Sequence, residues 1–320
     1  MPSRLSRLEA RYPAMRIERG ARLWLAVAGL AALVVAIYSE SFLGIVKLWT
    51  LSAYNHCFLV FPIGFYLLWR RRRTLAIVAI EPSWLGLALV CGLAVAWYLG
   101  RVIALQALEH VAAIMAIPAI VLAVMGGRFF RAALLPMVFL LLAIPVGEFL
   151  IPVLMEVTAD IARSLLGIVG IPAYRQGQFI SLPGGDFEVA DVCSGLKYLL
   201  ASLPLALLFA SWAYRGTLAR LMFVAVTAVV FIVGNGVRAF IVMIVASASE
   251  LEYFAGRDHV IFGNVFFVAL LVLVCWVGWR YADPPEADKA IDPRHPLAGK
   301  AVRSIAVAVA AAASLAVGSA

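Results

Sequence analysis

Apolar residues occur along this chain in long runs that are separated by short clusters of charged residues. A membrane-spanning helix needs about 20 consecutive apolar residues to cross a hydrocarbon core of roughly 30 Å. Membrane-spanning strands would instead alternate apolar and polar residues over about 10 positions. The pattern therefore predicts an all-α, polytopic transmembrane helical bundle of about eight or nine spans. The predicted spans are residues 23–39, 56–69, 83–100, 102–125, 131–147, 193–213, 219–246, 260–279 and 304–319.

The stretch 148–170 is apolar but does not read as a simple crossing. It is interrupted by Glu148, Glu156, Asp160 and Arg163. We expect an amphipathic helix that lies on the outer membrane surface with its acidic side chains in water. A further pair of crossings here is the alternative, because two spans would also preserve the orientation of everything downstream.

Residues 173–193 connect this stretch to the next predicted span. They contain two turn signals, Arg175-Gln-Gly and Leu-Pro-Gly-Gly at 182–185, which flank short alternating runs. Such a pattern is typical of a β-hairpin. We therefore expect a small hairpin outside the membrane, immediately before Cys193.

Polar composition divides the chain into four parts. Residues 1–22 form a basic N-terminus, and residues 23–280 form the transmembrane domain. Residues 281–303 are polar and rich in proline, which is typical of a linker. Residues 304–320 form a final apolar run that ends in Val-Gly-Ser-Ala. We expect this run to be a further transmembrane segment that anchors a periplasmic domain in a longer protein.

The composition agrees with a protein whose main solvent is lipid. Hydrophobic residues make up 64% of the chain and charged residues only 14%, which is too apolar for an ordinary water-exposed surface. The net charge of +8 does not indicate nucleic-acid binding, because the basic residues cluster at the ends of apolar runs. In such positions, arginine and lysine set the orientation of a membrane protein.

The basic clusters also suggest which way the chain is oriented. If residues 1–22 are cytoplasmic, alternation of the spans places the clusters at 70–73, 128–131, 215–220 and 280–303 on the same side. Most of the 26 basic residues are then cytoplasmic. The first 22 residues carry six arginines and no small-residue cleavage site follows before Glu40, so we expect the first span to remain as an anchor.

This topology brings one cysteine to the outer face. Cys193 begins a predicted span, where the free backbone amides of a first helical turn favour a thiolate. A small packing residue is the alternative interpretation of the same position. Cys91 and Cys275 lie inside spans and are expected to be packing residues, while Cys57 is either a packing residue or a disulfide partner. The four cysteines lack the spacing of a disulfide framework or a zinc site.

Arg238 and His259 lie near the outer ends of the next two spans. An arginine inside a span costs roughly 2.5–3.5 kcal/mol on insertion scales and usually faces a cavity or a partner. Arg238 therefore either reaches the headgroups or stabilises a thiolate, an oxyanion or a substrate carboxylate. Asn235 lies one helical turn earlier on the same face. His259 is the natural general acid and base. We expect no metal or other cofactor, because too few ligands converge.

The sequence around these residues resembles the exosortase and archaeosortase family. The family signature is a Cys-Ser-Gly loop, an Asn-x-x-Arg in the next span and a His-x-x-x-Gly at the start of the one after. Here these motifs are Cys193-Ser194-Gly195, Asn235 to Arg238 and His259 to Gly263. The likeness covers roughly residues 20–280 and is greatest to the exosortase A branch.

The resemblance implies the function. It implies a membrane cysteine protease or transpeptidase of the bacterial inner membrane, with its active site on the periplasmic face and links to exopolysaccharide and biofilm. Its partners would be exported proteins with a C-terminal PEP-CTERM signal, membrane lipid and an unknown acceptor, with no nucleic acid. Cys193, Arg238 and His259 would be catalytic, and Asn235, Ser194 and Gly195 supporting. A transporter or polysaccharide-export subunit, in which Arg238 lines a substrate path, is the alternative function.

Overall fold

A computed structural model of the chain describes residues 36–51, 53–249 and 258–284, together with the single positions 25, 29 and 32. The described residues divide into two compact units, which are treated separately below. Unit 1 contains residues 57–145 and the helix before them, and unit 2 contains residues 146–284 and the short segment 51–56. The predicted last span at 304–319 lies outside the described residues, as does most of the first one.

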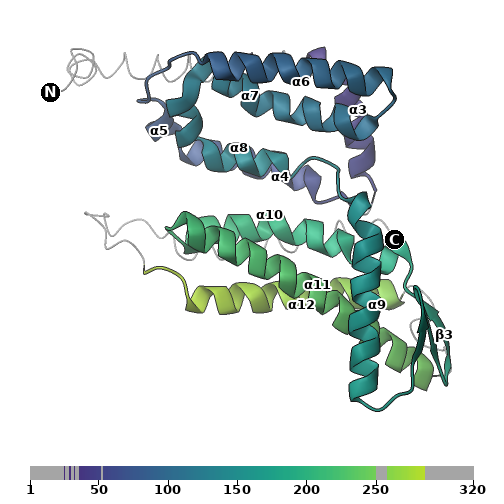
Figure 1. The fold of residues 1–320 in the computed structure, drawn as a ribbon. Helices are drawn as coiled ribbons and strands as arrows, with labels where there is room; N and C mark the ends of the chain where they lie inside the picture. Colours follow the sequence, from purple (N-terminus) through teal and green to yellow (C-terminus); the bar gives the residue numbers. More distant parts are fainter. Residues whose placement is uncertain are drawn as a thin grey trace. The chain divides into compact units, whose positions relative to one another are not determined.

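Unit 1 is entirely helical. Its helices are α3 (Ser39–Trp49), α4 (Cys57–Arg70), α5 (Arg72–Leu75), α6 (Trp84–Val102), α7 (Gln106–Ala132) and α8 (Leu134–Leu141). The most extensive helix packing in unit 1 is between α6 and α7, which run side by side (Figure 1). Close packing there depends on Gly86, since a β-carbon at this position would lie 2.3 Å from the backbone nitrogen of Ala123.

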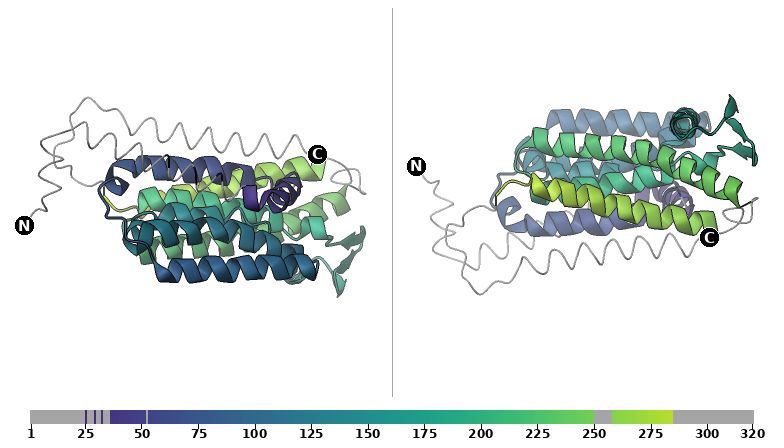
Figure 2. Two further views of the ribbon diagram at one scale, coloured as in Figure 1. Left: turned by 90° about the horizontal axis from the view of Figure 1, so that it is seen from above. Right: turned by 90° about the horizontal axis from the view of Figure 1, so that it is seen from below.

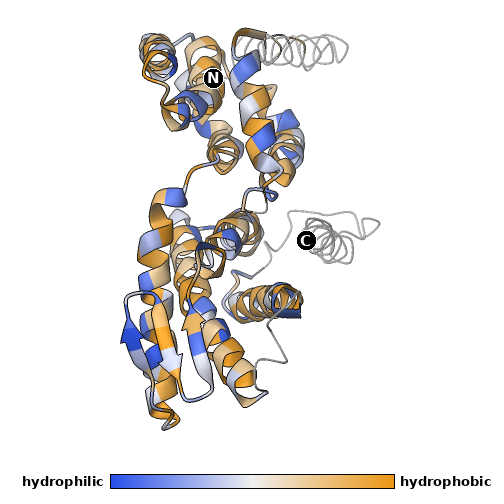
Figure 3. Ribbon diagram, turned by 90° about the vertical axis from the view of Figure 1, so that its right-hand side faces the viewer, coloured by the Kyte–Doolittle hydropathy of each residue, from blue (hydrophilic) through white to orange (hydrophobic). Residues whose placement is uncertain are grey.

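Unit 2 combines helices with a small sheet. Its elements are η1 (Glu148–Leu150), α9 (Ile151–Ile168), β1 (Tyr174–Gln176), β2 (Phe179–Leu182), β3 (Gly185–Glu188), η2 (Asp191–Cys193), α10 (Leu196–Ala213), α11 (Thr217–Ala248) and α12 (Asp258–Arg280). The helices α10, α11 and α12 run alongside one another (Figure 2). Hydrophobic residues line the helices, whereas the strands mix both kinds of residue (Figure 3).

Five helical segments are long and apolar enough to cross a membrane within the described part of the chain. They are Trp84–Val102, Gln106–Ala132, Asp191–Ala213, Thr217–Ala248 and Asp258–Arg280. The shorter apolar helix Cys57–Arg70 matches a sixth predicted span. The all-α, polytopic fold is therefore confirmed, and the predicted number of spans is confirmed in part.

The structure differs from the predicted spans in two places. Helix α3 begins at Ser39, where the first predicted span ends, and it occupies a stretch for which no span was predicted; its Glu40 is paired with Arg101 of α6. The predicted span 131–147 contains the eight-residue helix α8 and the last two residues of α7. The kink at Gly126, whose φ is +83°, divides α7 into two helical segments, so the end of the predicted span 102–125 agrees with the structure.

The stretch 148–170 forms one helix, α9, that runs across the direction of α10–α12 (Figures 1 and 2). The buried residues of α9 fall on one face at helical spacing, and they are Leu154, Met155, Thr158, Ala159, Ala162 and Leu166. This face packs against α11 and the sheet. A helix with three charged residues that crosses the bundle direction agrees with the predicted surface helix rather than with a pair of spans.

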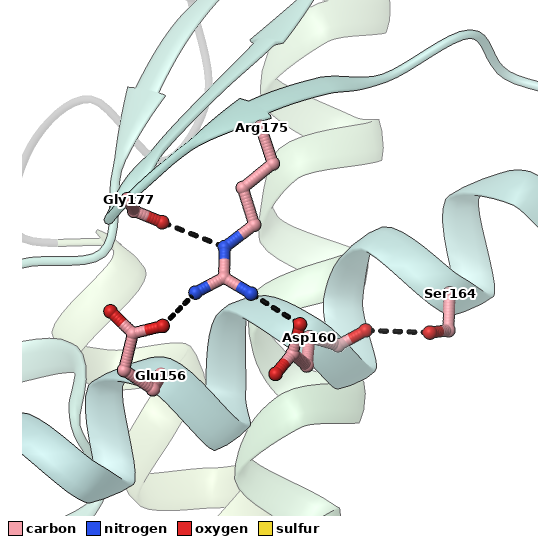
Figure 4. Close-up of polar contacts among 5 residues, drawn as sticks. All are labelled: Glu156, Asp160, Ser164, Arg175 and Gly177. Carbon is pink, nitrogen blue, oxygen red and sulfur yellow. Dashed lines mark hydrogen bonds and ion pairs between the residues drawn. The ribbon is translucent and has the colours of Figure 1, made fainter.

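The predicted hairpin is a three-stranded antiparallel sheet in the order β1-β2-β3. Arg175 of β1 fastens the sheet to α9 through ion pairs with Glu156 and Asp160, and its Nε also donates to the Gly177 carbonyl at 2.7 Å (Figure 4). The expectation that Glu156 and Asp160 simply face water was therefore incomplete. Their carboxylates are half to two-thirds exposed, yet they position the sheet.

The crossing of α9 over α11 depends on one glycine. A β-carbon at Gly236 would lie 2.5 Å from Cβ of Ile161, a distance that forces the two helices apart. Gly167 on α9 has nothing within 4 Å of the equivalent position. The two glycines therefore form a matched pair, one in contact and one in open space.

We predict that Gly236→Ala lowers stability by about 1–3 kcal/mol, the usual cost of overpacking. Gly167→Ala should instead stabilise slightly, because alanine is favoured over glycine in a helix by about 1 kcal/mol. The thermal unfolding midpoint of the purified protein in detergent measures both. Adding Ile161→Gly, which removes the Cβ that the new methyl group would meet, to Gly236→Ala should restore part of the overpacking loss. Equal midpoints for the two glycine variants would show that the crossing is not tight.

Candidate active site

Three residues predicted from sequence to act together line one pocket of unit 2. Cys193, Arg238 and His259 lie around it, and they come from η2, α11 and α12. The rest of its lining comes from β3 and its end (Phe187, Glu188, Val189) and from α11 (Ala239, Val242, Met243). The structure thus brings the predicted nucleophile, cation and acid–base group to one place.

Cys193 lies before α10 rather than in its first turn, which corrects the predicted place of the thiol, while the membrane-length segment Asp191–Ala213 agrees with the predicted span. It ends the short η2 turn, and α10 begins three residues later at Leu196. Gly195 separates the two with a φ of +81°, a left-handed conformation that glycine adopts without strain. The turn holds Cys193 partly exposed at the end of the bundle.

The side chain of Asn235 fixes the position of the cysteine loop. Its Nδ2 donates to the backbone carbonyl of Cys193 at 2.8 Å and lies 2.9 Å from Oγ1 of Thr158. A β-carbon on Gly195 would come within 2.5 Å of Cγ of Asn235. The loop therefore needs glycine both for its backbone conformation and for the close approach of this amide.

Ser194 has a local role in the same loop. Its side chain is buried, and Oγ accepts a hydrogen bond from the backbone N–H of Leu196 at 3.3 Å. This bond satisfies one of the free amides at the start of α10. The N-cap residue of α10 is Gly195, so Ser194 supports the start of the helix from the residue before the cap and shapes the backbone of the cysteine loop.

The segment from Gly234 to Arg238 contacts a different neighbour at each position. Gly234 allows close approach of Leu270 on α12, and Gly236 allows that of Ile161 on α9. Asn235 faces the cysteine loop between them. Consecutive helical residues point about 100° apart, so α11 packs on three sides along this one segment.

Arg238 is a buried cation without a counter-charge among the described residues. Its residue is only 5% exposed, its Nε has no hydrogen-bond partner, and no described acidic side chain forms an ion pair with it. The guanidinium lies 5.8 Å from the ring centroid of Tyr198. A β-carbon on Gly263 would lie 2.9 Å from Nε, which explains why the His-x-x-x-Gly motif ends in glycine here.

Buried charge of this kind is costly unless something pairs with it. The aromatic face of Tyr198 supplies part of the compensation, and Tyr198 is itself oriented by the hydrogen bond from its hydroxyl to Oδ1 of Asn264, at 3.2 Å. The Nε that remains is buried and has no hydrogen-bond partner among the described residues.

The site lies at the end of the bundle opposite a basic cluster. At that other end the Tyr214 hydroxyl donates to the Gly278 carbonyl at 2.8 Å, and Arg220 Nε donates to the Tyr214 carbonyl at 2.8 Å. From Arg220 to Arg238 the continuous helix α11 rises about 27 Å at 1.5 Å per residue. A hydrocarbon core is roughly 30 Å thick, so the rise from Arg220 to Arg238 is close to the thickness of that core.

The described residues were compared with known families once this geometry was in hand. The family model for transmembrane exosortases (Exosortase_EpsH) matches residues 48–276, which is more than two thirds of the chain. The chain belongs to the transmembrane exosortase family. The match is consistent with the exosortase A branch. No curated protein and no solved structure matches the chain.

Family membership gives the general function. Exosortases are membrane sorting enzymes of the cysteine transpeptidase type, and they act on exported proteins that carry C-terminal signals. The matched region contains every residue that lines the pocket around Cys193. This family member is therefore a multi-pass membrane sorting enzyme.

The other three cysteines have no place in this pocket. Cys57 is buried in unit 1, where its Sγ contacts the Leu142 carbonyl at 3.8 Å. Cys91 is exposed and Cys275 is partly buried on their helices. The burial of Cys57 against the Leu142 carbonyl agrees with its interpretation as a packing residue. No cluster of three potential metal ligands occurs among the described residues.

Sequence reasoning missed two residues that support the site, Thr158 and Tyr198. Thr158 lies on α9, far from every motif, and its hydroxyl is buried against Asn235. Its signal was a lone hydroxyl on the apolar stripe of an amphipathic helix, because a buried polar group needs a partner. Tyr198 lies four residues after Ser194 of the cysteine motif, and this i to i+4 spacing is the only sequence signal for it.

We predict that Thr158→Val destabilises this protein by about 1–2 kcal/mol, because it leaves the buried Asn235 amide with one partner fewer. Thr158→Ser keeps a hydroxyl at the same place and should lose less. The midpoint of thermal unfolding and the rate of Cys193 alkylation by iodoacetamide measure the effect on the fold and on the loop. A valine variant that matches wild type in both would argue against a role for this contact.

Proposed function

We propose that this exosortase cleaves the C-terminal sorting signal of exported proteins with Cys193 as nucleophile, Arg238 as electrostatic stabiliser and His259 as general acid and base. The observation that carries the proposal is the shared pocket, which these three residues line from three separate elements. Asn235, Ser194 and Gly195 support the nucleophile by shaping its loop.

Acylation follows from these roles. His259 accepts the proton of the Cys193 thiol, and Sγ attacks the carbonyl carbon of the scissile peptide bond. The carbonyl oxygen becomes an oxyanion, which Arg238 stabilises with a guanidinium that is already in place and largely shielded from water. The C–N bond then breaks, and His259 returns its proton to the leaving amine. A thioester on Cys193 remains.

Release of the thioester reverses the same steps. His259 accepts a proton from an incoming nucleophile, which attacks the thioester carbon and displaces Cys193. An amine acceptor gives transpeptidation and water gives hydrolysis, since both reactions share the acyl-enzyme. The family is one of transpeptidases, so we propose transfer to an acceptor, which the partially exposed position of Cys193 leaves room to approach.

The proposed substrate is an exported protein with a C-terminal PEP-CTERM signal, which consists of a Pro-Glu-Pro motif, a membrane-spanning segment and a basic tail. Its processing is linked with exopolysaccharide and biofilm. A substrate helix anchored in the same bilayer presents its preceding residues at the membrane surface. The height of Arg238 on α11 matches this position, and we propose that the substrate enters laterally from the lipid.

The proposed location is the bacterial inner membrane, with a cytoplasmic N-terminus and the pocket on the periplasmic face. The distribution of basic residues supports this orientation. In unit 1, Arg71 donates to the Ala132 carbonyl at 2.6 Å, so the cluster at 70–73 lies at the same end as Arg128 and Arg131. In unit 2, Arg215 and Arg220 lie at the end opposite the pocket.

We predict a covalent adduct on Cys193 when the purified protein is incubated with a peptide that carries the PEP-CTERM signal. Intact-mass spectrometry should show the acylated wild-type chain and no adduct on Cys193→Ala. Cys91→Ala is the matched control, because its thiol lies outside the pocket, and it should be acylated normally. If the folded wild type forms no adduct and cleaves no peptide, the transporter function becomes the better hypothesis.

We predict that Arg238→Lys lowers the rate of acylation by roughly 10²- to 10³-fold, as expected when an oxyanion donor is removed. Lysine keeps the charge but loses the planar guanidinium that lies beside Tyr198. Single-turnover kinetics with saturating peptide isolates this step from binding. A lysine variant with wild-type acylation would show that charge alone suffices and that the geometry at Nε is unimportant.

A further inference from the structure

The strand β3 has an open edge beside the candidate active site. Among the described residues the sheet order is β1-β2-β3, so β3 has a strand neighbour on one side only. The open side of an edge strand presents unpaired backbone N–H and C=O groups that can pair with another chain. The backbone groups of β3 that face this edge follow from the register of the sheet.

The pairing of β2 with β3 defines this register. Phe187 pairs with Ile180 and Glu188 with Phe179, and one residue further the N–H of Val189 donates to the Gln178 carbonyl at 2.9 Å. Hydrogen-bonded and non-hydrogen-bonded pairs alternate along an antiparallel ladder. Phe187 is therefore in a hydrogen-bonded pair, whereas Glu188 and Asp186 turn their backbone groups away from β2, toward the open edge.

The same strand forms part of the lining of the pocket. Phe187 and Glu188 line it together with Cys193 and His259. One face of α11 completes this side of the lining with Ala239, Val242 and Met243, at i, i+3 and i+4. The β1 strand at the other edge of the sheet contributes nothing to this lining. Of the two outer edges of the sheet, the edge of β3 is thus the one that lies beside Cys193.

We propose that the substrate segment next to the scissile bond binds as an added strand along the open edge of β3, with its backbone paired to Asp186 and Glu188. This inference rests on the proposed function, because it takes the occupant to be the sorting-signal peptide. The continuity of the edge with the Cys193 pocket selects this occupant over a second copy of the chain. Strand addition draws affinity from main-chain hydrogen bonds and leaves alternate side chains to set specificity.

The proposed signal fits this mode of binding. Along an extended peptide, alternate residues direct their backbone groups to the same side. In Pro-Glu-Pro the two prolines can face away from β3, where the missing N–H is not needed, while the central residue offers both its N–H and its C=O to the edge. Prolines on the outer side also prevent a further chain from pairing with the bound peptide.

Binding to the inactive Cys193→Ala variant tests this inference without depending on the chemistry. The probes are fluorescent PEP-CTERM signal peptides, and their Kd is measured by anisotropy in detergent. A methyl group on the nitrogen of the central glutamate removes the donor that should face β3, and we expect at least a tenfold higher Kd. Replacing the first proline with N-methylalanine keeps a tertiary amide at a position that faces away, and its Kd should stay within about threefold of the parent peptide's.

A variant of the strand supplies the matching test from the protein side. Glu188→Pro removes the N–H at the open edge without breaking the ladder to β2, and proline is tolerated in that position of an edge strand. It should bind the parent peptide at least tenfold more weakly than Glu188→Ala, which loses the same side chain but keeps the N–H. Unchanged iodoacetamide labelling of the native Cys193 in Glu188→Pro shows that the pocket remains folded.

The outcomes separate the two proposals. Equal Kd values for both methylated peptides, or for Glu188→Pro and Glu188→Ala, would overturn strand addition while leaving the acyl-enzyme intact. Selective loss of binding with the central methyl group, combined with no covalent adduct on the wild type, would support the docking mode and contradict the thiol mechanism.

Discussion

The side chain of Asn235 is the contact on which the rest of the site depends. It ties the cysteine loop and α9 to α11 through one amide, which donates to the Cys193 carbonyl and to the Thr158 hydroxyl. Both partners are distant from Asn235 in sequence. A buried amide of this kind is costly if any partner is lost, so the position of the nucleophile is coupled to the packing of α9 on α11.

Small residues make this contact possible. Gly195 and Gly236 lie on either side of the amide, and each lets a neighbour approach to a distance that a methyl group would prevent. Close approach through small residues is a general device of helix packing in membranes, where lipid supplies no hydrophobic force between helices. Arg238 then uses the remaining space, held between Tyr198 and Gly263 without an acidic partner among the described residues.

Much of this arrangement could be predicted from sequence, but not all of it. Hydropathy located the helices because apolar length is a direct physical requirement of the bilayer, and the spacing of Cys193, Arg238 and His259 along those helices placed them at one end. Boundaries were harder. Helix α3 begins where the first predicted span ends, because the charge of Glu40 interrupts the apolar run, and Glu40 pairs with Arg101, which is distant in sequence.

The role of α9 was the least predictable part. Its acidic residues suggested a water-exposed face, and Arg175, which binds two of them, lies on a strand beyond the helix. Thr158 showed no motif at all, and only its partner Asn235 gives it meaning. Contacts between segments that are distant in sequence leave no periodic pattern, so a single sequence does not reveal them.

A small sheet beside a membrane helix bundle has a physical purpose that helices cannot fulfil. Every backbone group inside a transmembrane helix is already bonded within that helix, so the bundle offers no main-chain partners to a peptide. A peptide that must be cut near a membrane surface is extended there, with its own N–H and C=O groups exposed. The open edge of β3 lies beside Cys193, and in the proposed mode of binding it supplies such groups at the place where the proposed cleavage chemistry requires the substrate to be held.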